Sequence, residues 1–166
     1  TDFRASERMA QLIVQVAGRA GRHDRPGQVL IQTRHPDHPL LQLLVRQGYP
    51  AFAHAAMQER QAARLPPFTS LALLRAEATH ENLPLRFLEA VREQVETASV
   101  GQVGVWGPVP AAMGRRAGRF RAQLLLQSDS RGTLQKLLST RVRQLEQNKL
   151  ARQVRWSVDV DPADTY

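Results

Sequence analysis

The order of the apolar patterns after residue 67 constrains the fold of this 166-residue chain more than any other feature. Pro66 and Pro67 end the helical spacing that precedes them, and the periodicity of the apolar residues changes directly afterwards. From there the patterns predict strand, helix, strand, strand, helix and strand, over residues 69–78, 82–99, 103–107, 120–127, 130–147 and 154–161. With right-handed crossovers this order predicts a four-stranded antiparallel sheet with both helices on one face.

The side chains of these elements agree with that order. Each predicted helix carries an apolar stripe, and the last strand alternates between apolar and polar residues. The apolar positions are Phe87, Leu88, Val91, Val95, Leu134, Leu137, Leu138, Val142, Leu145, Val154, Trp156, Val158 and Val160. The opposite positions of the last strand are Arg155, Ser157, Asp159 and Asp161. The predicted fold class is α+β, with a ferredoxin-like βαββαβ domain over residues 68–166.

The first 33 residues predict a helix and then a strand. A turn at residues 23–27 leads into a predicted strand at residues 28–33. Helix then strand is how an α/β lobe ends, so we interpret residues 1–33 as the tail of such a lobe. Without its sheet neighbours we expect this tail to be mobile or to pack differently. The apolar side of the helix, suited to packing on a sheet, consists of Met9, Leu12, Ile13, Val16 and Ala20.

Residues 34–67 predict a helical connector between these two parts. One helix is expected at residues 40–47 and a second at residues 51–64, separated by the break at Gly48-Tyr49-Pro50. The sequence therefore divides into three predicted parts, at residues 1–33, 34–67 and 68–166.

Polar side chains gather on one sector of the first helix, close to two glycines. Gly18 and Gly21 each cost a helix about 1 kcal/mol against alanine, which suggests that a ligand approaches the backbone there. A polyphosphate fits, because guanidinium groups bind phosphate oxygens in a bidentate manner. The alternative is a surface helix with a solvated basic side and a frayed end. The polar sector consists of Arg8, Gln11, Gln15, Arg19 and Arg22.

The stretch Gln15-Val16-Ala17-Gly18-Arg19-Ala20-Gly21-Arg22 resembles the sixth motif of superfamily-two helicases, which lies in their second RecA-like lobe. Four further segments narrow this resemblance to the PriA family, the primosomal protein N-prime group of bacterial replication-restart DNA helicases. The resemblance covers nearly the whole chain, and the matching segments follow in the same order. The segments are Asp2-Phe3-Arg4-Ala5-Ser6-Glu7-Arg8, Pro26-Gly27-Gln28-Val29-Leu30-Ile31-Gln32-Thr33, Pro66-Pro67-Phe68 and Val158-Asp159-Val160-Asp161-Pro162.

The resemblance implies that residues 1–33 are the end of a RecA-like helicase lobe. Arg19 and Arg22 would face the phosphates of ATP, with Arg22 as the arginine finger, and Gln15 and Gly18 would complete the ATP contact. ATP and Mg²⁺ are therefore implied for the intact protein. This chain contains no Gly-x-x-x-x-Gly-Lys-Ser/Thr loop and no acidic Walker B strand, so we expect no ATP hydrolysis by it alone.

The same resemblance implies an ATP-dependent 3′-to-5′ DNA helicase that recognises stalled or branched forks and starts primosome assembly in the bacterial cytoplasm. Single-stranded DNA-binding protein and other primosome proteins are the implied partners, alongside single-stranded and branched DNA. The zinc-binding cysteines of the family lie in a region that this chain does not contain. Because the chain begins without Met and lacks Walker motifs, we expect it to be a piece of a longer protein.

The positive charge of the chain is concentrated in residues 108–155, which carry 11 basic and two acidic residues. A field of this kind favours a polyanion, nucleic acid before an anionic membrane. The candidate DNA-binding residues lie in the connection between the central strands: Arg115, Arg116, Arg119, Phe120 and Arg121. Two alternatives stay open: Phe120 stacks on a base or belongs to the core, and the arginines bind phosphates or only solubilise a hairpin.

Other chemistry receives little support from the sequence. The chain has no cysteine, and its His35/His38 pair spans a proline-broken turn without a third ligand, so no metal is expected. Asp159 and Asp161 share one side of the last strand and are expected to pair with arginines or to end the strand. No apolar run approaches the ~18 residues of a membrane span. The alternative to the helicase hypothesis is a free-standing RNA- or ribosome-binding ferredoxin-like module. A small-molecule regulatory domain is the third and least favoured hypothesis.

Overall fold

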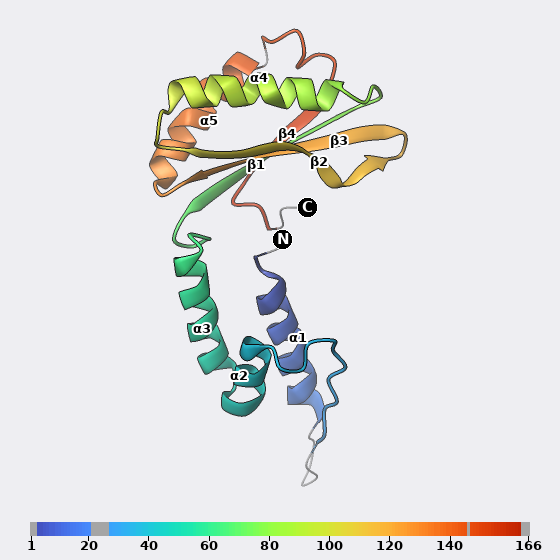
Figure 1. The fold of residues 1–166 in the computed structure, drawn as a ribbon, viewed down its shortest axis with the longest axis vertical. Helices are drawn as coiled ribbons and strands as arrows, with labels where there is room; N and C mark the ends of the chain where they lie inside the picture. The colour runs from blue at the N-terminus through green and yellow to red at the C-terminus, as the bar shows by residue number, and fades with distance from the viewer. Residues whose placement is uncertain (1–2, 21–26, 146, 164–166) are drawn as a thin grey trace. The chain divides into compact units, whose positions relative to one another are not determined.

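The computed structural model describes residues 3–20, 27–145 and 147–163, and it divides into two compact units between Arg64 and Leu65 (Figure 1). The first unit is helical and the second is built on a sheet. Each unit is described by itself.

The first unit contains α1 (Ala5–Ala20), α2 (Pro39–Gln47) and α3 (Tyr49–Ala62). Gly48, with φ of +84°, separates α2 from α3, as the predicted break requires. The three helices share a small apolar cluster, and Arg60 of α3 binds Glu7 of α1 at 2.6 Å. α1 packs on the other helices through Ala10 and Ile13, whereas Leu12, Val16 and Ala20 of its predicted apolar side are exposed. The buried members of the cluster are Ala10, Leu40, Leu44, Phe52 and Ala56.

The strand predicted at residues 28–33 is wrong, because residues 27–33 have no regular secondary structure. Leu30 is 87% exposed there. A strand is stable only when a neighbour takes up its backbone hydrogen bonds, and the local sequence cannot supply that neighbour. Whether residues 1–33 behave as a separate, mobile part stays a prediction.

The second unit is a four-stranded antiparallel sheet of order β2-β3-β1-β4. Its strands are β1 (Ser70–Ala78), β2 (Gly104–Arg116), β3 (Arg119–Ser128) and β4 (Arg155–Val160). α4 (Leu83–Ala98) follows β1, and α5 (Arg131–Leu145) follows β3, and both helices lie on one face of the sheet (Figure 1). The predicted sequence of elements is confirmed, with helix and strand ends shifted by a few residues except in β2.

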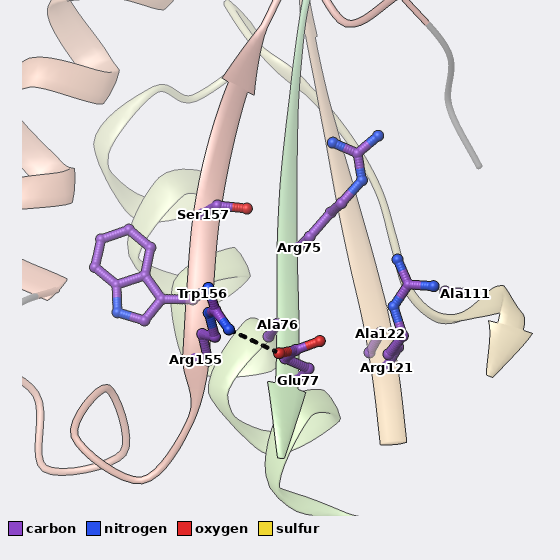
Figure 2. A pocket seen from close by; sticks show the side chains of 9 residues that line it. All are labelled: Arg75, Ala76, Glu77, Ala111, Arg121, Ala122, Arg155, Trp156 and Ser157. Atoms are coloured by element: carbon purple, nitrogen blue, oxygen red, sulfur yellow. Dashed lines mark ion pairs between the residues drawn. The ribbon is translucent and has the colours of Figure 1, made fainter. Parts of the chain in front are cut away.

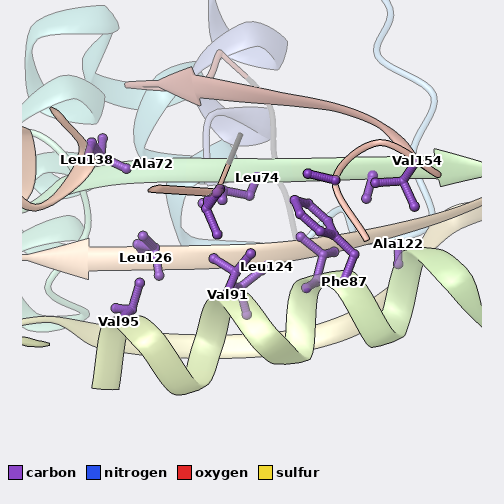
Figure 3. Packing of buried hydrophobic residues seen from close by; sticks show 14 of the residues in the cluster. Ala72, Leu74, Phe87, Val91, Val95, Ala122, Leu124, Leu126, Leu138 and Val154 are labelled. Atoms are coloured by element: carbon purple, nitrogen blue, oxygen red, sulfur yellow. The ribbon is translucent and has the colours of Figure 1, made fainter. Parts of the chain in front are cut away.

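The core of this unit lies between the sheet and the two helices, and it follows the predicted apolar stripes (Figure 3). Phe87, Leu88 and Val91 of α4 belong to one cluster with Leu74 of β1 and with Leu124 and Leu126 of β3, all nearly inaccessible to solvent. Trp156 and Val158 of β4 pack against the same cluster, and the Trp156 ring lies 5.8 Å from that of Phe87. Of the other predicted apolar positions, Val160 is 36% exposed; the side chain of Val142 lies outside the described residues.

β2 is much longer than the sequence predicts. The prediction ended it at residue 107 and placed residues 108–119 in a connection, but the strand continues to Arg116 through two register shifts. Pro108 and Pro110 lie within it, which is tolerated because β2 is at the edge of the sheet and need not donate on its outer side. The candidate residues Arg115 and Arg116 therefore lie in a strand rather than a loop.

Candidate nucleic-acid interface

The β2–β3 hairpin ends in a two-residue turn formed by Ala117 and Gly118. Both residues have positive φ, +48° and +76°, which is the conformation whose twist matches the flanking antiparallel strands. The turn sets Arg116 opposite Arg119 and Arg115 opposite Phe120. Four of the five predicted DNA-binding residues thus surround one turn, and Arg115, Arg116 and Arg119 are exposed.

Phe120 does not present a free ring at the end of this hairpin. The residue is half-buried, and the guanidinium carbon of Arg115 lies 5.2 Å from the centre of its ring. This is a cation–π contact, so one side of the ring is occupied by the neighbouring arginine. Phe120 also lies outside the apolar cluster of the described second unit. The structure therefore supports neither the fully buried nor the open stacking arrangement for Phe120.

Arg121 points to the sheet face away from the helices, where it lines a hollow of about 350 Å³ (Figure 2). Because strand residues alternate, Arg121 lies on the side opposite Ala122 and Leu124, which belong to the core. Two further arginines line the same hollow, Arg75 of β1 and Arg155 of β4. Arginines from three adjacent strands therefore line one hollow on this face.

Two carboxylates accompany these arginines. Glu77 stands opposite both Arg121 and Arg155 in the sheet, and Arg155 Nη1 lies 3.9 Å from Glu77 Oε1. Arg75 Nη1 donates to Asp159 Oδ2 at 3.0 Å. Arginines thus outnumber carboxylates on this face, and an incoming anion meets a net positive charge.

Asp159 and Asp161 pair with arginines, as the sequence analysis expects. Asp159 binds Arg75, and Asp161 Oδ2 lies 3.2 Å from Arg131 Nη2. Within residues 3–20, 27–145 and 147–163, no group of three or more His, Asp or Glu side chains is placed to hold a metal ion. In the same ranges no helix is long and apolar enough to cross a membrane.

Gln15, Gly18 and Arg19 lie in the second half of α1 and are exposed. A Cβ built on Gly18 would meet no atom within 4 Å, so the backbone there is open to an approaching group. Arg22, the predicted arginine finger, lies outside the described residues, as does Gly21. The helical conformation of the motif is thus described only as far as Ala20.

Sequence reasoning missed three residues of this interface: Arg75, Arg155 and Trp106. Trp106 of β2 is 61% exposed and stands opposite Leu125 of β3. A partial signal was available for Arg155, because it lies on the polar side of the alternating last strand. Only the order of the strands brings it next to Arg75 and Arg121.

Comparison with known proteins places these features in context. A family model described as the primosomal protein N C-terminal domain matches residues 61–163. Replication restart protein PriA of Haemophilus influenzae is 47% identical over 98% of this chain and 22% of its own length. The Synechocystis protein of the same name is 38% identical over 78% of this chain and 16% of its own length, and the Bacillus subtilis protein 31% over 97% and 20%.

The chain therefore spans about a fifth of the length of the curated relatives it matches. Among solved structures, a de novo designed protein named Foldit4 covers 57% of this chain and 97% of itself, with a TM-score of 0.43 and 17% identity. That likeness is too distant to bear on function.

Proposed function

The chain belongs to the primosomal protein N C-terminal domain family, and from this membership we propose that it is the C-terminal part of an ATP-dependent DNA helicase of replication restart. In the whole protein the proposed activity is 3′-to-5′ unwinding, with recognition of stalled or branched forks and initiation of primosome assembly. The role proposed for this chain is to bind DNA and partner proteins, including single-stranded DNA-binding protein. The proposed location is the bacterial cytoplasm, at the nucleoid.

The observation that carries the DNA-binding role is the exposed arginine set on the β2–β3 hairpin. Arg115, Arg116 and Arg119 are exposed around a fixed two-residue turn, so their charges are available to a phosphate backbone. Guanidinium groups bind phosphate oxygens through paired hydrogen bonds and stay charged at any working pH. Contacts of this kind give affinity without reading sequence, which suits a protein that acts at forks wherever they stall.

The topology of the second unit supports the ferredoxin-like class. The elements follow in the order βαββαβ, and the sheet order β2-β3-β1-β4 places β1 and β3 at its centre. Two split βαβ units with right-handed crossovers have this order. In the first unit, α1 is proposed to be the remnant of the second RecA-like lobe, followed by a helical connector.

The proposed ATP contact involves Gln15, Gly18, Arg19 and Arg22 in the intact protein. The exposed side chains of Gln15 and Arg19 and the open space at Gly18 fit a triphosphate close to the backbone. Bound ATP and Mg²⁺ would supply the transferable phosphoryl group and its charge neutralisation. The proposed roles of the chain are to hold the phosphates with Arg19 and to stabilise transition-state charge with Arg22.

DNA binding is tested by measuring affinity for single-stranded, duplex and forked DNA across a salt series. The double variant Arg116→Ala/Arg119→Ala removes the exposed pair beside the turn. We expect the slope of log affinity against log salt on single strands to fall by about 1.4, since each phosphate contact contributes roughly 0.7. The control, Arg86→Ala/Lys136→Ala, removes the same charge from exposed positions of α4 and α5. Equal slopes for the hairpin variant and this control would refute the hairpin as the DNA contact.

The helicase assignment is tested in the intact protein by DNA-dependent ATP hydrolysis. If Arg22 acts as an arginine finger, Arg22→Ala reduces the hydrolysis rate by about 10³- to 10⁵-fold while ATP still binds. Unchanged hydrolysis in this variant would remove the proposed role of Arg22.

A further inference from the structure

The sheet face away from α4 and α5 carries binding features that the hairpin turn does not account for. We call it the open face and define it by Arg75, Glu77, Trp106, Arg121, Arg155 and Ser157. Their common side follows from the register: Glu77 stands opposite Arg121 and Arg155, Arg75 opposite Ser157, and Trp106 opposite Leu125. Each alternates with a neighbour directed to the helices.

The hollow on the open face is suited to a phosphate group. Its floor is the backbone of three adjacent strands at Ala76, Ala122 and Trp156, and the side chain of Trp156 points to the helix side (Figure 2). Arginine side chains stand around the floor, and the side chain of Arg155 is 81% exposed. Its contact to Glu77 is long, at 3.9 Å, so an anion can take its place at little cost.

Trp106 supplies an aromatic surface on the same face. The side chain is 61% exposed, and its Nε1 donates to Gln127 Oε1 at 3.2 Å, which fixes the orientation of the ring. A large exposed ring held by one hydrogen bond is a ready stacking partner for a nucleobase. Stacking requires a base outside a duplex, so this ring favours single strands over paired DNA.

The two features lie at a separation that one nucleic-acid strand can span. Trp106 stands opposite Leu125 and the hollow lies at Arg121, four residues along β3. At ~3.3 Å per strand residue this is about 13 Å along the strands, and β1 at the middle of the hollow lies two strands, or about 10 Å, to the side of β2. The direct separation is therefore about 16 Å, which a few nucleotides of a single strand can span. A strand crossing the open face can therefore place one base on Trp106 and a backbone phosphate in the hollow.

We propose that the open face binds single-stranded DNA, with a base stacked on Trp106 and a backbone phosphate held by Arg75, Arg121 and Arg155. The inference deepens the proposed function, because it rests on DNA binding by this chain and names the form of DNA and the surface. The excess of arginines over carboxylates selects a polyanion, and the exposed ring selects unpaired bases. Trp106 and Arg155 are the residues that separate this surface from the hairpin turn.

The first test uses the fluorescence of Trp106 in the 166-residue chain with a 15-nucleotide thymidine oligonucleotide. The chain has two tryptophans, so Trp156→Phe leaves Trp106 as the reporter. We expect the oligonucleotide to quench its emission and to protect it from acrylamide. Trp106→Ala is expected to weaken binding by about 5- to 150-fold, the usual loss for one stacked base, and Trp106→Phe by less. Urea unfolding shows that each variant is folded.

The second test addresses the phosphate site. Arg155→Ala removes an exposed charge and is expected to lower the salt slope on single strands by about 0.7, as one lost phosphate contact does. Arg86→Ala on α4 is the matched control and leaves the slope unchanged. If Trp106→Ala and Arg155→Ala bind as the wild-type chain does while Arg116→Ala/Arg119→Ala weakens binding, the open face is refuted and the hairpin role stands.

Two further outcomes distinguish failure of the proposed DNA-binding role from failure of the assignment to DNA. If the wild-type chain binds no DNA at low salt, the proposed DNA-binding role fails, and this inference fails with it. If a uridine oligonucleotide of equal length binds tenfold more tightly than the thymidine one, the assignment to DNA is overturned.

Discussion

Gly118 fixes the end of the β2–β3 hairpin through its backbone, and alanine at this position tests that argument. Its φ is +76°, and a Cβ built there would meet no atom within 4 Å. An alanine side chain would therefore meet no steric clash. The expected loss of stability comes from holding alanine in the left-handed conformation, which costs about 1–2 kcal/mol. That cost corresponds to the hairpin end opening roughly 5- to 30-fold more often.

Native-state amide exchange measures this opening directly. In Gly118→Ala we expect the amides of residues 115–120 to exchange roughly 5- to 30-fold faster, whereas those of β1 stay unchanged. Forked DNA is expected to bind more weakly, because Arg116 and Arg119 lose their fixed arrangement. The control is Gly101→Ala, which has φ of +72° and equally open space but lies before β2. If both variants exchange alike at residues 115–120, the turn does not organise the hairpin.

Three other substitutions probe separate parts of the chain. Phe87→Ala removes a ring with no exposed surface and is expected to cost the second unit about 3–5 kcal/mol, seen as a lower urea midpoint. Gly18→Ala lies in an exposed helical position with open space around it, so thermal unfolding should show α1 stabilised by up to about 1 kcal/mol. Asp159→Asn removes the carboxylate paired with Arg75, so fluorescence titration should show a several-fold tighter complex with single-stranded DNA at low salt.

The elements with strong local patterns could be predicted from the sequence alone. The α4 stripe of Phe87, Leu88, Val91 and Val95 reaches the core as expected, and so do the alternating residues Ala122 and Leu124 of β3. In these segments burial depends on a face that the segment itself defines by its periodicity. Local reasoning therefore places the helices, three strands and most of the core.

The errors occur where the outcome depends on neighbours. Residues 28–33 have the apolar run of a short strand but no partner in the described structure, so they form no strand. In β2, Gly107, Pro108 and Pro110 read as turn signals, yet the strand passes through them because it lies at the edge of the sheet. Partner strands and edge positions are properties of the assembled sheet, which periodicity does not report.

The candidate interface shows the same division. The hairpin arginines are adjacent in sequence and could be found by their charge alone. Arg75 and Arg155 come from opposite ends of the second unit, and the central position of β1 brings them together. Trp106 lies in the segment predicted as strand, where an aromatic residue is ordinary, and only its exposure of 61% distinguishes it.

Phe120 and Trp106 differ in the contact that each can make with DNA, and the dependence of binding on salt distinguishes the two contacts. Phe120 has Arg115 against its ring, so it supports a charged contact, whereas Trp106 offers an exposed ring. For each phosphate contact, a tenfold increase in salt lowers the logarithm of the affinity by about 0.9 on duplex DNA and by about 0.7 on single strands. Stacking is far less affected by salt. The ratio of single-strand to duplex affinity should therefore rise as salt increases. In Trp106→Ala the ratio should be lower at every salt concentration, whereas its rise with salt should stay the same, because stacking contributes little to the salt dependence. If Trp106→Ala leaves the ratio unchanged at every salt concentration, stacking on Trp106 contributes nothing and charge alone holds the single strand.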